Sequence, residues 1–495
     1  MSKQIQLDEN GKRKFGFMDK LTYAAGDFGC NMSFALKGTV NTFWLVYMCL
    51  ETGLFSALLL AVQIWDAIND PLIGSIIDAD RRKYRMGKFK TYILIGAIGL
   101  LVAGALVFIP VKEADDIIKS IVFIVGYVIW DAFYTIANVP YGSMLSLITT
   151  KDSERAQLST WRSLGSVFGN MLPMVILPMI IWRDKVDENG NPVLNPETGK
   201  QMEELLGERV FIAALLMGIL GFIAFMFMIR KTEIRVDENS VMVNEKTEKF
   251  NVFKAFGNFM KNRPAVGTTL AAMGMFIGMN ASTTATQIMF SIHFEMAELS
   301  GVVTVVGMLP MFIFMPFIKK MVDRWGKKES AAAGAAFSLL GGVLMFAFPA
   351  LPPSSGLIVF IASLMIFGLG LGVYTCVSWA MMGDAIDYND WKTGRREEGT
   401  VYALHSFFRK LAQGLGPSAV ILIMGLMGYN SKLEIGEQSA QTAQNMCWLV
   451  AALWFISAVL MFIGIALIYN LDKKTTAKMQ EELRLRNEEA EKIEA

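Results

Sequence analysis

Two aspartates stand four residues apart inside an apolar stretch, "QIWDAINDPLIG", at residues 63–74. Side chains at i and i+4 of a helix share one face, so Asp66 and Asp70 would bring two carboxylates together about one turn apart. A charge inside a bilayer costs roughly 2.5 to 3.5 kcal/mol or more, and two adjacent anions need a cation or a proton beside them. Because hard oxygen ligands suit Na⁺ or Li⁺, the spacing predicts a cation site.

Two further residues add oxygen atoms to this predicted site. Asn69 lies between the aspartates, and Thr135 is a candidate third source in another apolar stretch. We therefore expect Asp66, Asn69, Asp70 and Thr135 to hold Na⁺. The alternative, in which the acids only form salt bridges with a basic residue across a cavity, stays open.

The stretch "YTIANVPYGS", residues 134–143, offers a hydroxyl, an amide and ring surfaces from Tyr134, Asn138 and Tyr141. Aromatic rings with nearby amides suit a sugar, which presents an apolar face and a rim of hydroxyl groups that need partners once dehydrated. The same residue types also join membrane helices to one another. Both interpretations apply to each of the three residues.

Cations also occur within apolar stretches. Arg162 in "STWRSLGSVFG" and Lys410 in "HSFFRKLAQGLG" would pair with the aspartates or bind a solute. His405 and Ser406 lie within five residues of Lys410 and join it as candidate solute contacts.

Lys37 in "SFALKGTVNTF" lies well inside the first apolar stretch, where we expect it to neutralise Asp27 or to bind an anionic solute. Asp131, Asp384 and Asp387 fall towards the ends of their predicted helices. For these three, half-solvated structural roles together with "GRREEG" are the simpler interpretation.

The elements that position these side chains are predicted membrane-spanning helices, because each apolar stretch is about 20 residues or longer. The chain of 495 residues is 53% hydrophobic and 18% charged, with a mean hydropathy of +0.41. Twelve spans are expected, at residues 21–49, 54–77, 91–110, 117–148, 157–182, 209–230, 265–292, 299–322, 330–350, 356–386, 400–428 and 444–470.

Orientation follows from Lys and Arg in the short loops. The loop after the second span, "DADRRKYRMGKFK", is strongly basic, and the other even-numbered loops repeat this bias. We therefore expect a multi-pass protein of the bacterial cytoplasmic (inner) membrane with both termini in the cytoplasm and no signal peptide. The long connection at residues 183–208 is predicted to lie outside.

Composition excludes several other classes. The net charge of +1 gives no electrostatic reason to expect a nucleic-acid partner. The four cysteines lack paired spacing, and no phosphate-binding loop or nucleophile motif occurs. We expect no enzyme activity and no cofactor apart from a coupling ion, and a monomer whose partners are its solute and the lipid bilayer.

Weak internal repeats relate the two halves: "GSIIDADRRKYRMGKFK" at residues 74–90 recurs partly as "FIKKMVDRWGKKE" at residues 317–329. The prediction is an all-α membrane protein of the major facilitator fold, with two pseudo-symmetric six-helix bundles around a central cavity. The expected boundaries are 1–230 for the first bundle, 231–264 for a cytoplasmic linker, 265–470 for the second bundle and 471–495 for a cytoplasmic tail.

Four segments, "WDAINDPLIG", "GKFK", "NVPYGS" and "GRREEGTVYALHSFFRKLAQGLG", resemble signatures of the glycoside-pentoside-hexuronide:cation symporter family. The resemblance extends over nearly the whole chain. It implies that Asp66, Asn69, Asp70 and Thr135 form the cation site, and that Arg162 and Lys410 contact the sugar.

The sugar site departs from the pattern of the melibiose permease, a member of this family. Asn31 and Asn138 stand where that pattern has aspartates, and Gly142 stands where it has a tryptophan. The resemblance is therefore greater to glucuronide- and xyloside-transporting members, and import of a glycoside, pentoside or glucuronide is expected. A proton-coupled exporter or a uniporter of another small polar solute is the alternative.

Overall fold

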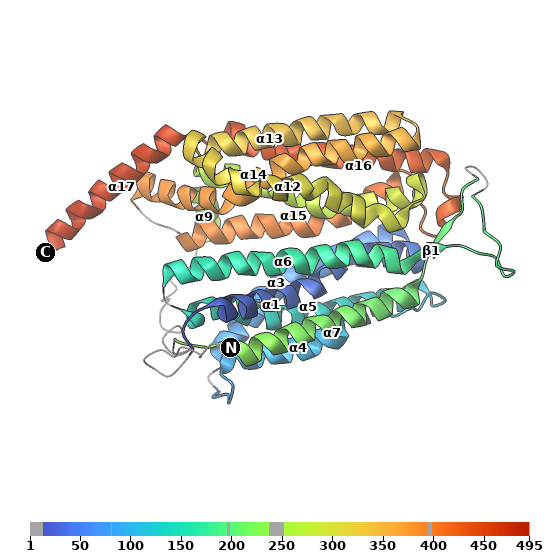
Figure 1. Cartoon of the computed structure of the whole chain (residues 1–495), viewed down its shortest axis with the longest axis horizontal. Helices are drawn as coiled ribbons and strands as arrows, with labels where there is room; N and C mark the ends of the chain where they lie inside the picture. Colours follow the sequence, from blue (N-terminus) through green and yellow to red (C-terminus); the bar gives the residue numbers. More distant parts are fainter. Residues whose placement is uncertain are drawn as a thin grey trace, which may run out of the picture. The chain divides into compact units, whose positions relative to one another are not determined.

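The computed structural model describes residues 13–80, 82–149, 151–195, 199–236, 252–394 and 398–494. The chain divides into two compact units (Figure 1). Unit 1 comprises Met1–Lys246 and Asn430–Gly436, and unit 2 comprises Thr247–Tyr429 and Glu437–Ala495. The division falls inside the predicted linker.

Unit 1 is a bundle of helices. Its first span is broken into α1 (Phe17–Phe34), α2 (Leu36–Thr42) and the π-helical η1 (Phe43–Tyr47). The other spans of unit 1 are α3 (Thr52–Ala79), α4 (Lys88–Leu106), α5 (Asp116–Ile148), α6 (Asp152–Ile181) and α7 (Gly207–Lys231). Helix α5 packs against α3 and α4, and α1 packs against α6 and α7.

Unit 2 begins with α9 (Val252–Lys261) and ends with α17 (Lys473–Glu494). Its first span is broken into α10 (Arg263–Phe276), η2 (Ile277–Ala281), α11 (Ser282–Met289) and η3 (Phe290–Phe294). The other spans are α12 (Ser300–Trp325), α13 (Lys327–Leu344) continued by η5 (Met345–Ala350), α14 (Pro353–Thr393), α15 (Glu398–Leu426), and α16 (Ala440–Phe462) continued by η7 (Ile463–Ile468).

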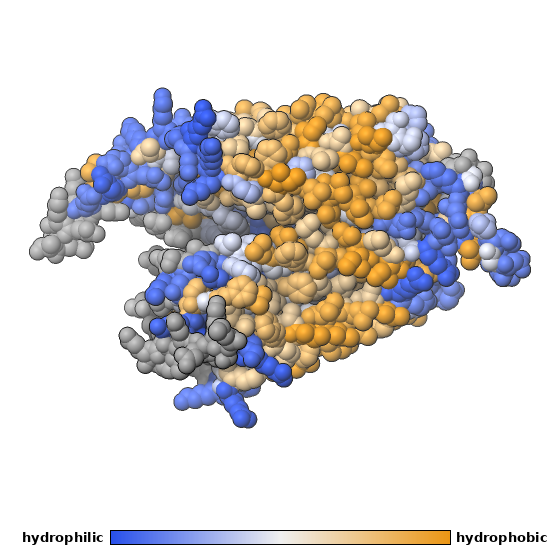
Figure 2. Space-filling model, in the orientation of Figure 1, coloured by the Kyte–Doolittle hydropathy of each residue, from blue (hydrophilic) through white to orange (hydrophobic). Residues whose placement is uncertain are grey.

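Each of the twelve predicted spans is helical in the structure. The largest difference at a start is in α6, predicted from 157 and observed from Asp152. The largest difference at the end of a span is in α14, which was predicted to end at 386 and ends at Thr393. Polar residues continue this 41-residue helix past its apolar part. Within the described ranges, nine helices are long and apolar enough to cross a membrane. Apolar side chains cover the middle of the helices, and hydrophilic ones gather at their ends (Figure 2).

The long connection between α6 and α7 contains a small antiparallel hairpin. Strand β1 (Trp182–Asp184) pairs with β2 (Glu203–Leu205), with Arg183 opposite Glu204. These two side chains form an ion pair at 2.6 Å, and Lys185 forms another with Glu434. Charged pairs thus hold the hairpin together and attach it to residues Asn430–Gly436 of the same unit.

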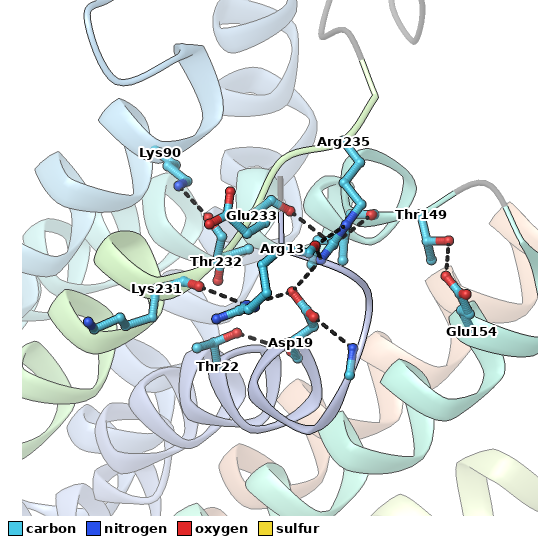
Figure 3. A network of polar contacts seen from close by, with 12 residues as sticks. Arg13, Asp19, Thr22, Lys90, Thr149, Glu154, Lys231, Thr232, Glu233 and Arg235 are labelled. Atoms are coloured by element: carbon cyan, nitrogen blue, oxygen red, sulfur yellow. Dashed lines mark hydrogen bonds and ion pairs between the residues drawn. The ribbon is translucent and has the colours of Figure 1, made fainter. Parts of the chain in front are cut away.

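A polar network fixes the start of α1 (Figure 3). Asp19 is fully buried, and its carboxylate accepts hydrogen bonds from Arg13 Nη2 at 2.8 Å, Arg235 Nη2 at 3.1 Å and the Gly16 N–H at 2.9 Å. Lys90 Nζ donates to the Thr232 carbonyl at 2.7 Å. The chain that leaves α7 is thereby tied to the beginnings of α1 and α4, which positions the rest of α1.

The basic loop after α3 is anchored by Asp80. Its carboxylate accepts hydrogen bonds from the hydroxyls of Tyr84 at 2.5 Å and Tyr92 at 2.7 Å and from the Arg82 N–H at 2.9 Å. Donors to a carboxylate stabilise its charged form, and they lower the pKa of Asp80 to about 2. The turn therefore stays anchored over the whole neutral range.

Close helix contacts in unit 1 depend on glycine. A Cβ on Gly96 of α4 would lie 2.5 Å from the Ala137 nitrogen of α5, and one on Gly165 of α6 would lie 2.1 Å from the Ala24 carbonyl oxygen of α1. Both neighbours are backbone atoms, which cannot rotate away as a side chain can. These positions let the backbones of α4 and α5, and of α1 and α6, approach closely.

We predict that Gly96→Ala lowers the thermal unfolding midpoint of the purified protein by at least about 3 °C, because the clash outweighs the roughly 1 kcal/mol that alanine gains in a helix. Gly142→Ala on α5 is the matched control, since its added Cβ meets no atom within 4 Å. That control should keep or raise the midpoint. Equal midpoints for the two variants would contradict the close contact of α4 with α5.

Candidate functional site

Helix α3 presents the predicted cation ligands from one face. Its N-cap is Glu51, whose carboxylate accepts hydrogen bonds from the N–H groups of Gly53 at 2.9 Å and Leu54 at 2.7 Å. Asn69 is 1% exposed, whereas Asp66 and Asp70 are half-buried. One amide and two carboxylates thus come from two successive turns of α3.

Three of the four predicted ligands, two from α3 and one from α5, form one hydrogen-bonded chain. Thr135 Oγ1 donates to Asp70 Oδ1 at 2.8 Å, and Asn69 Nδ2 donates to Thr135 Oγ1 at 3.0 Å. Asn69 Nδ2 also donates to Asp131 Oδ2 at 3.0 Å. A carboxylate, an amide and a hydroxyl from two neighbouring helices therefore meet at one place. We call Asp66, Asn69, Asp70, Asp131 and Thr135 the acidic cluster.

The fourth predicted ligand, Asp66, has a basic partner. Lys37 Nζ lies 3.2 Å from Asp66 Oδ2, and both side chains are about one quarter exposed. The predicted neutralisation of Asp27 by Lys37 is wrong, because Asp27 pairs with Arg162 instead. Lys37 is on α2, beyond the turn at Ala35, and its side chain reaches α3 rather than Asp27 of α1.

Asp131 is a member of the cluster that the sequence analysis missed. A half-solvated role near a helix end was expected, but Asp131 is 1% exposed and lies in the middle of α5. Asp131 is four residues before Thr135, so the i, i+4 rule applied to Asp66 and Asp70 would also have placed it here.

Asp384 also differs from its expected role. It is 4% exposed, and Lys327 Nζ of α13 lies 2.5 Å from its carboxylate. The Tyr469 hydroxyl donates to Asp384 Oδ2 at 3.4 Å. The predicted pairing with "GRREEG" involves residues 395–397, which lie outside the described residues.

A second polar network in unit 1 joins α1 to α6. Arg162 Nε donates to Asp27 Oδ1 at 3.0 Å, and Asn31 Nδ2 donates to Asp27 Oδ2 at 3.1 Å. Asn170 Nδ2 in turn donates to Asn31 Oδ1 at 2.6 Å. Two predicted solute residues, Arg162 and Asn31, are thus brought together. Asn170 was missed, although it is eight residues beyond Arg162 and so lies on the same face of α6.

The three predicted solute residues of α5 have different surroundings. Tyr141 is fully buried: its hydroxyl donates to the Tyr23 carbonyl at 2.7 Å, and its ring lies 5.1 Å from the Arg162 guanidinium. This gives Tyr141 a packing role. Tyr134 and Asn138 are half-buried one turn apart, and the Tyr134 ring lies 5.8 Å from the ring of Phe34.

In unit 2, the predicted solute residues follow α15. His405 is 5% exposed, its Nδ1 lies 2.8 Å from Thr269 Oγ1 of α10, and its ring makes an edge contact with Trp379. These contacts give His405 a packing role. Ser406 and Lys410 are half-buried and one helical turn apart.

No group of three or more His, Cys, Asp or Glu side chains in the described part of the chain is arranged to hold a metal ion. The acidic cluster combines carboxylates with the amide of Asn69 and the hydroxyl of Thr135.

Multiple apolar helices and polar side chains enclosed among them define a membrane carrier rather than an enzyme. The chain belongs to the family described as MFS/sugar transport protein, whose sequence profile matches residues 22–473. The resemblance to glycoside-pentoside-hexuronide symporters and the major facilitator fold are thereby confirmed. The chain is a multi-pass membrane transporter.

The similarity to known relatives extends over most or nearly all of the chain. It is 29% identical to an uncharacterised symporter of Bacillus subtilis (strain 168), covering 97% of each chain. It is 27% identical to the glucuronide carrier protein homolog of Escherichia coli (strain K12), covering 82% of this chain and 83% of that one. Other relatives bear names of exporters as well as importers.

The fold matches a solved D-xylose-proton symporter with a TM-score of 0.55 at 15% identity, covering 90% of this chain and 96% of that one. At this identity the match concerns the fold alone.

We predict that Arg162→Met destabilises the protein by about 1 to 3 kcal/mol, because Asp27 is 5% exposed and would lose its cation. The Arg162 side chain is 38% exposed, so solvent screening keeps the cost below that of a fully buried pair. Thermal unfolding in detergent would measure this effect.

The double variant Asp27→Asn with Arg162→Met should recover most of the lost stability, since it removes both charges. Arg183→Met, which breaks the exposed hairpin pair with Glu204, is the matched control and should change stability little. A double variant no more stable than Arg162→Met would show that the Asp27 charge does not need Arg162.

Proposed function

We propose that this protein is a cation:sugar symporter that imports a glycoside or pentoside by alternating access, with Na⁺ or Li⁺ as the coupling ion. The observation that carries the proposal is the acidic cluster, in which Asp70, Thr135 and Asn69 are joined by hydrogen bonds of 2.8 to 3.0 Å inside a membrane carrier. Acidic side chains in membrane helices typically mark an ion pathway.

The chemistry of the cluster suits a small hard cation. Asp70 supplies carboxylate oxygens, Thr135 a hydroxyl and Asn69 an amide, and these are the ligand types that hard cations prefer. Asp66, the fourth predicted ligand, has one oxygen paired with Lys37. A proton is the alternative coupling ion, because a carboxylate beside other acids can be neutralised by protonation.

Coupled transport would follow from thermodynamic linkage between binding of the cation and binding of the solute. A bound cation neutralises carboxylates of α3 and holds them against the hydroxyl of α5, which orders the helix that also carries Tyr134 and Asn138. If cation binding raises solute affinity by a given factor, solute binding raises cation affinity by the same factor.

The network around Arg162 supports a neutral solute over a glucuronide. Asp27 lies 3.0 Å from Arg162 and cancels its charge locally, and the adjoining Asn31 and Asn170 are neutral. Amide groups of this kind exchange hydrogen bonds with sugar hydroxyls. A glucuronide, as in the name of the Escherichia coli relative, is the second candidate solute.

We further propose that the protein acts as a monomer in the bacterial inner membrane with both termini in the cytoplasm. The orientation is supported by the basic loop after α3, where Arg82, Lys83 and Arg85 follow one another within a few residues.

Uptake by proteoliposomes tests this function. We expect an inward Na⁺ gradient to stimulate uptake of at least one labelled neutral glycoside or pentoside by about tenfold or more over choline medium, with glucuronides transported less well. Absence of inward stimulation by Na⁺, Li⁺ or a proton gradient across the whole panel would favour the exporter or uniporter alternative.

Asp70→Asn should abolish the stimulation by Na⁺ while leaving solute exchange across the membrane measurable, because the variant keeps the size of the side chain and loses the charge. Asp184→Asn removes an exposed acid from strand β1 and is the matched control, expected to transport as the native protein does. Full Na⁺ stimulation in Asp70→Asn would exclude Asp70 as a cation ligand.

A further inference from the structure

The ammonium group of Lys37 lies in a site formed by three aromatic rings and one carboxylate. It is 5.1 Å from the ring centre of Phe34, 5.6 Å from that of Tyr127 and 5.8 Å from that of Trp130. Asp66 Oδ2 lies 3.2 Å away. Ring faces attract cations, and the attraction increases where water is excluded. The rings and the carboxylate thus both attract the Lys37 ammonium group.

The rings that surround Lys37 are themselves held in place. Gln63 Nε2 of α3 donates to the Tyr127 hydroxyl at 3.1 Å, and Trp130 Nε1 donates to Ser33 Oγ at 2.6 Å. Tyr127 and Trp130 are both at most 2% exposed. Helices α1, α3 and α5 thus build a fixed receptor for one ammonium group, and Lys37 of α2 fills it.

A second carboxylate, that of Asp131, lies within electrostatic range of this ammonium group. Asp131 is 1% exposed, and its Oδ1 is buried without a hydrogen-bond partner. The charge of Lys37 attracts this carboxylate, whereas that of Asp66 repels it. A buried carboxylate with an unpartnered oxygen depends on a nearby positive charge, and Lys37 provides one.

We propose that Lys37 is a covalently attached cation that permanently occupies the Asp66 and Asp131 side of the acidic cluster, so that the transported cation is held on the Asp70 and Thr135 side. Asn69, which donates to both Asp131 and Thr135, separates the two sides. Lys37 is then a determinant of cation affinity and number. This inference rests on the proposed cation site.

The charge of Lys37 opposes the binding of a second cation in the same low-dielectric surroundings. Removing it should therefore raise the affinity for Na⁺ by at least about tenfold, or add a second bound Na⁺. Removing the Asp131 charge has the opposite sign and should lower the affinity. Because the two changes oppose one another, the double variant should lie within about threefold of the native protein.

Direct binding of ²²Na⁺ to the purified full chain in lipid nanodiscs tests this inference without a transport assay. The variants are Lys37→Met, Lys37→Arg, Asp131→Asn and the double variant Lys37→Met with Asp131→Asn. All are measured at one ionic strength, maintained with choline, because salt screens charges. We expect the gain in Na⁺ affinity in Lys37→Met and none in Lys37→Arg, which keeps the charge.

Na⁺ affinities of the native protein and Lys37→Met that lie within twofold of one another would overturn the inference. Loss of labelled sugar binding in Lys37→Met with unchanged Na⁺ binding would overturn it as well. If Lys37→Met does not fold, the double variant compared with Asp131→Asn gives the same effect of Lys37. Na⁺ binding by Lys37→Met but not by the native protein would support the inference and exclude Na⁺ as the native coupling ion.

Discussion

The organisation of unit 1 depends on the cost of placing a charge in hydrocarbon. In the described part of unit 1, two ion pairs join different helices: Lys37 of α2 pairs with Asp66 of α3, and Arg162 of α6 pairs with Asp27 of α1. An isolated charge at these depths would destabilise the bundle, so each pair restricts the helices that carry it to positions where the partners meet. The first span, α1 with α2, supplies one member of each pair and is the element around which the others are arranged.

Close backbone packing makes these short polar contacts possible. Hydrogen bonds of about 3 Å between α3 and α5 require α5 to be held firmly from its other side, where α4 packs against it at Gly96. Likewise, α6 approaches α1 at Gly165, one turn of helix from Arg162. The small residues and the charged pairs therefore act together, since neither the packing nor the ion pairs would form in a loosely packed bundle.

The number and positions of the spans were predictable because apolar length is a direct consequence of bilayer thickness. The grouping of Asn69, Asp70 and Thr135 was also predicted, from helical spacing and from the resemblance to known symporters. The partner of Lys37 and the membership of Asp131 in the cluster are among the features that were not predicted. Which helices are neighbours decides both, and a hydropathy pattern contains no information about neighbours.

The partners of Tyr141 and His405 show the same limit. Both residue types suit sugar binding, yet the structure directs their polar atoms to the Tyr23 carbonyl and to Thr269. A polar side chain in a membrane helix must be satisfied somewhere, and a neighbouring helix can satisfy it as well as a solute can. Residue type therefore identifies candidates, while packing decides which of them remain accessible.

The two polar networks of unit 1 are joined through the first span. Asp27 and Asn31 belong to the Arg162 network, and Lys37 lies beyond the turn at Ala35, less than three turns further along. Phe34 lies between them, with its ring 5.1 Å from Lys37 and 5.8 Å from the ring of Tyr134. Tyr134 directly precedes Thr135, so a change at the acidic cluster reaches a candidate solute residue through one ring contact and one peptide bond. Under the proposed function, these contacts form a short physical route by which occupation of the cation site would alter solute affinity.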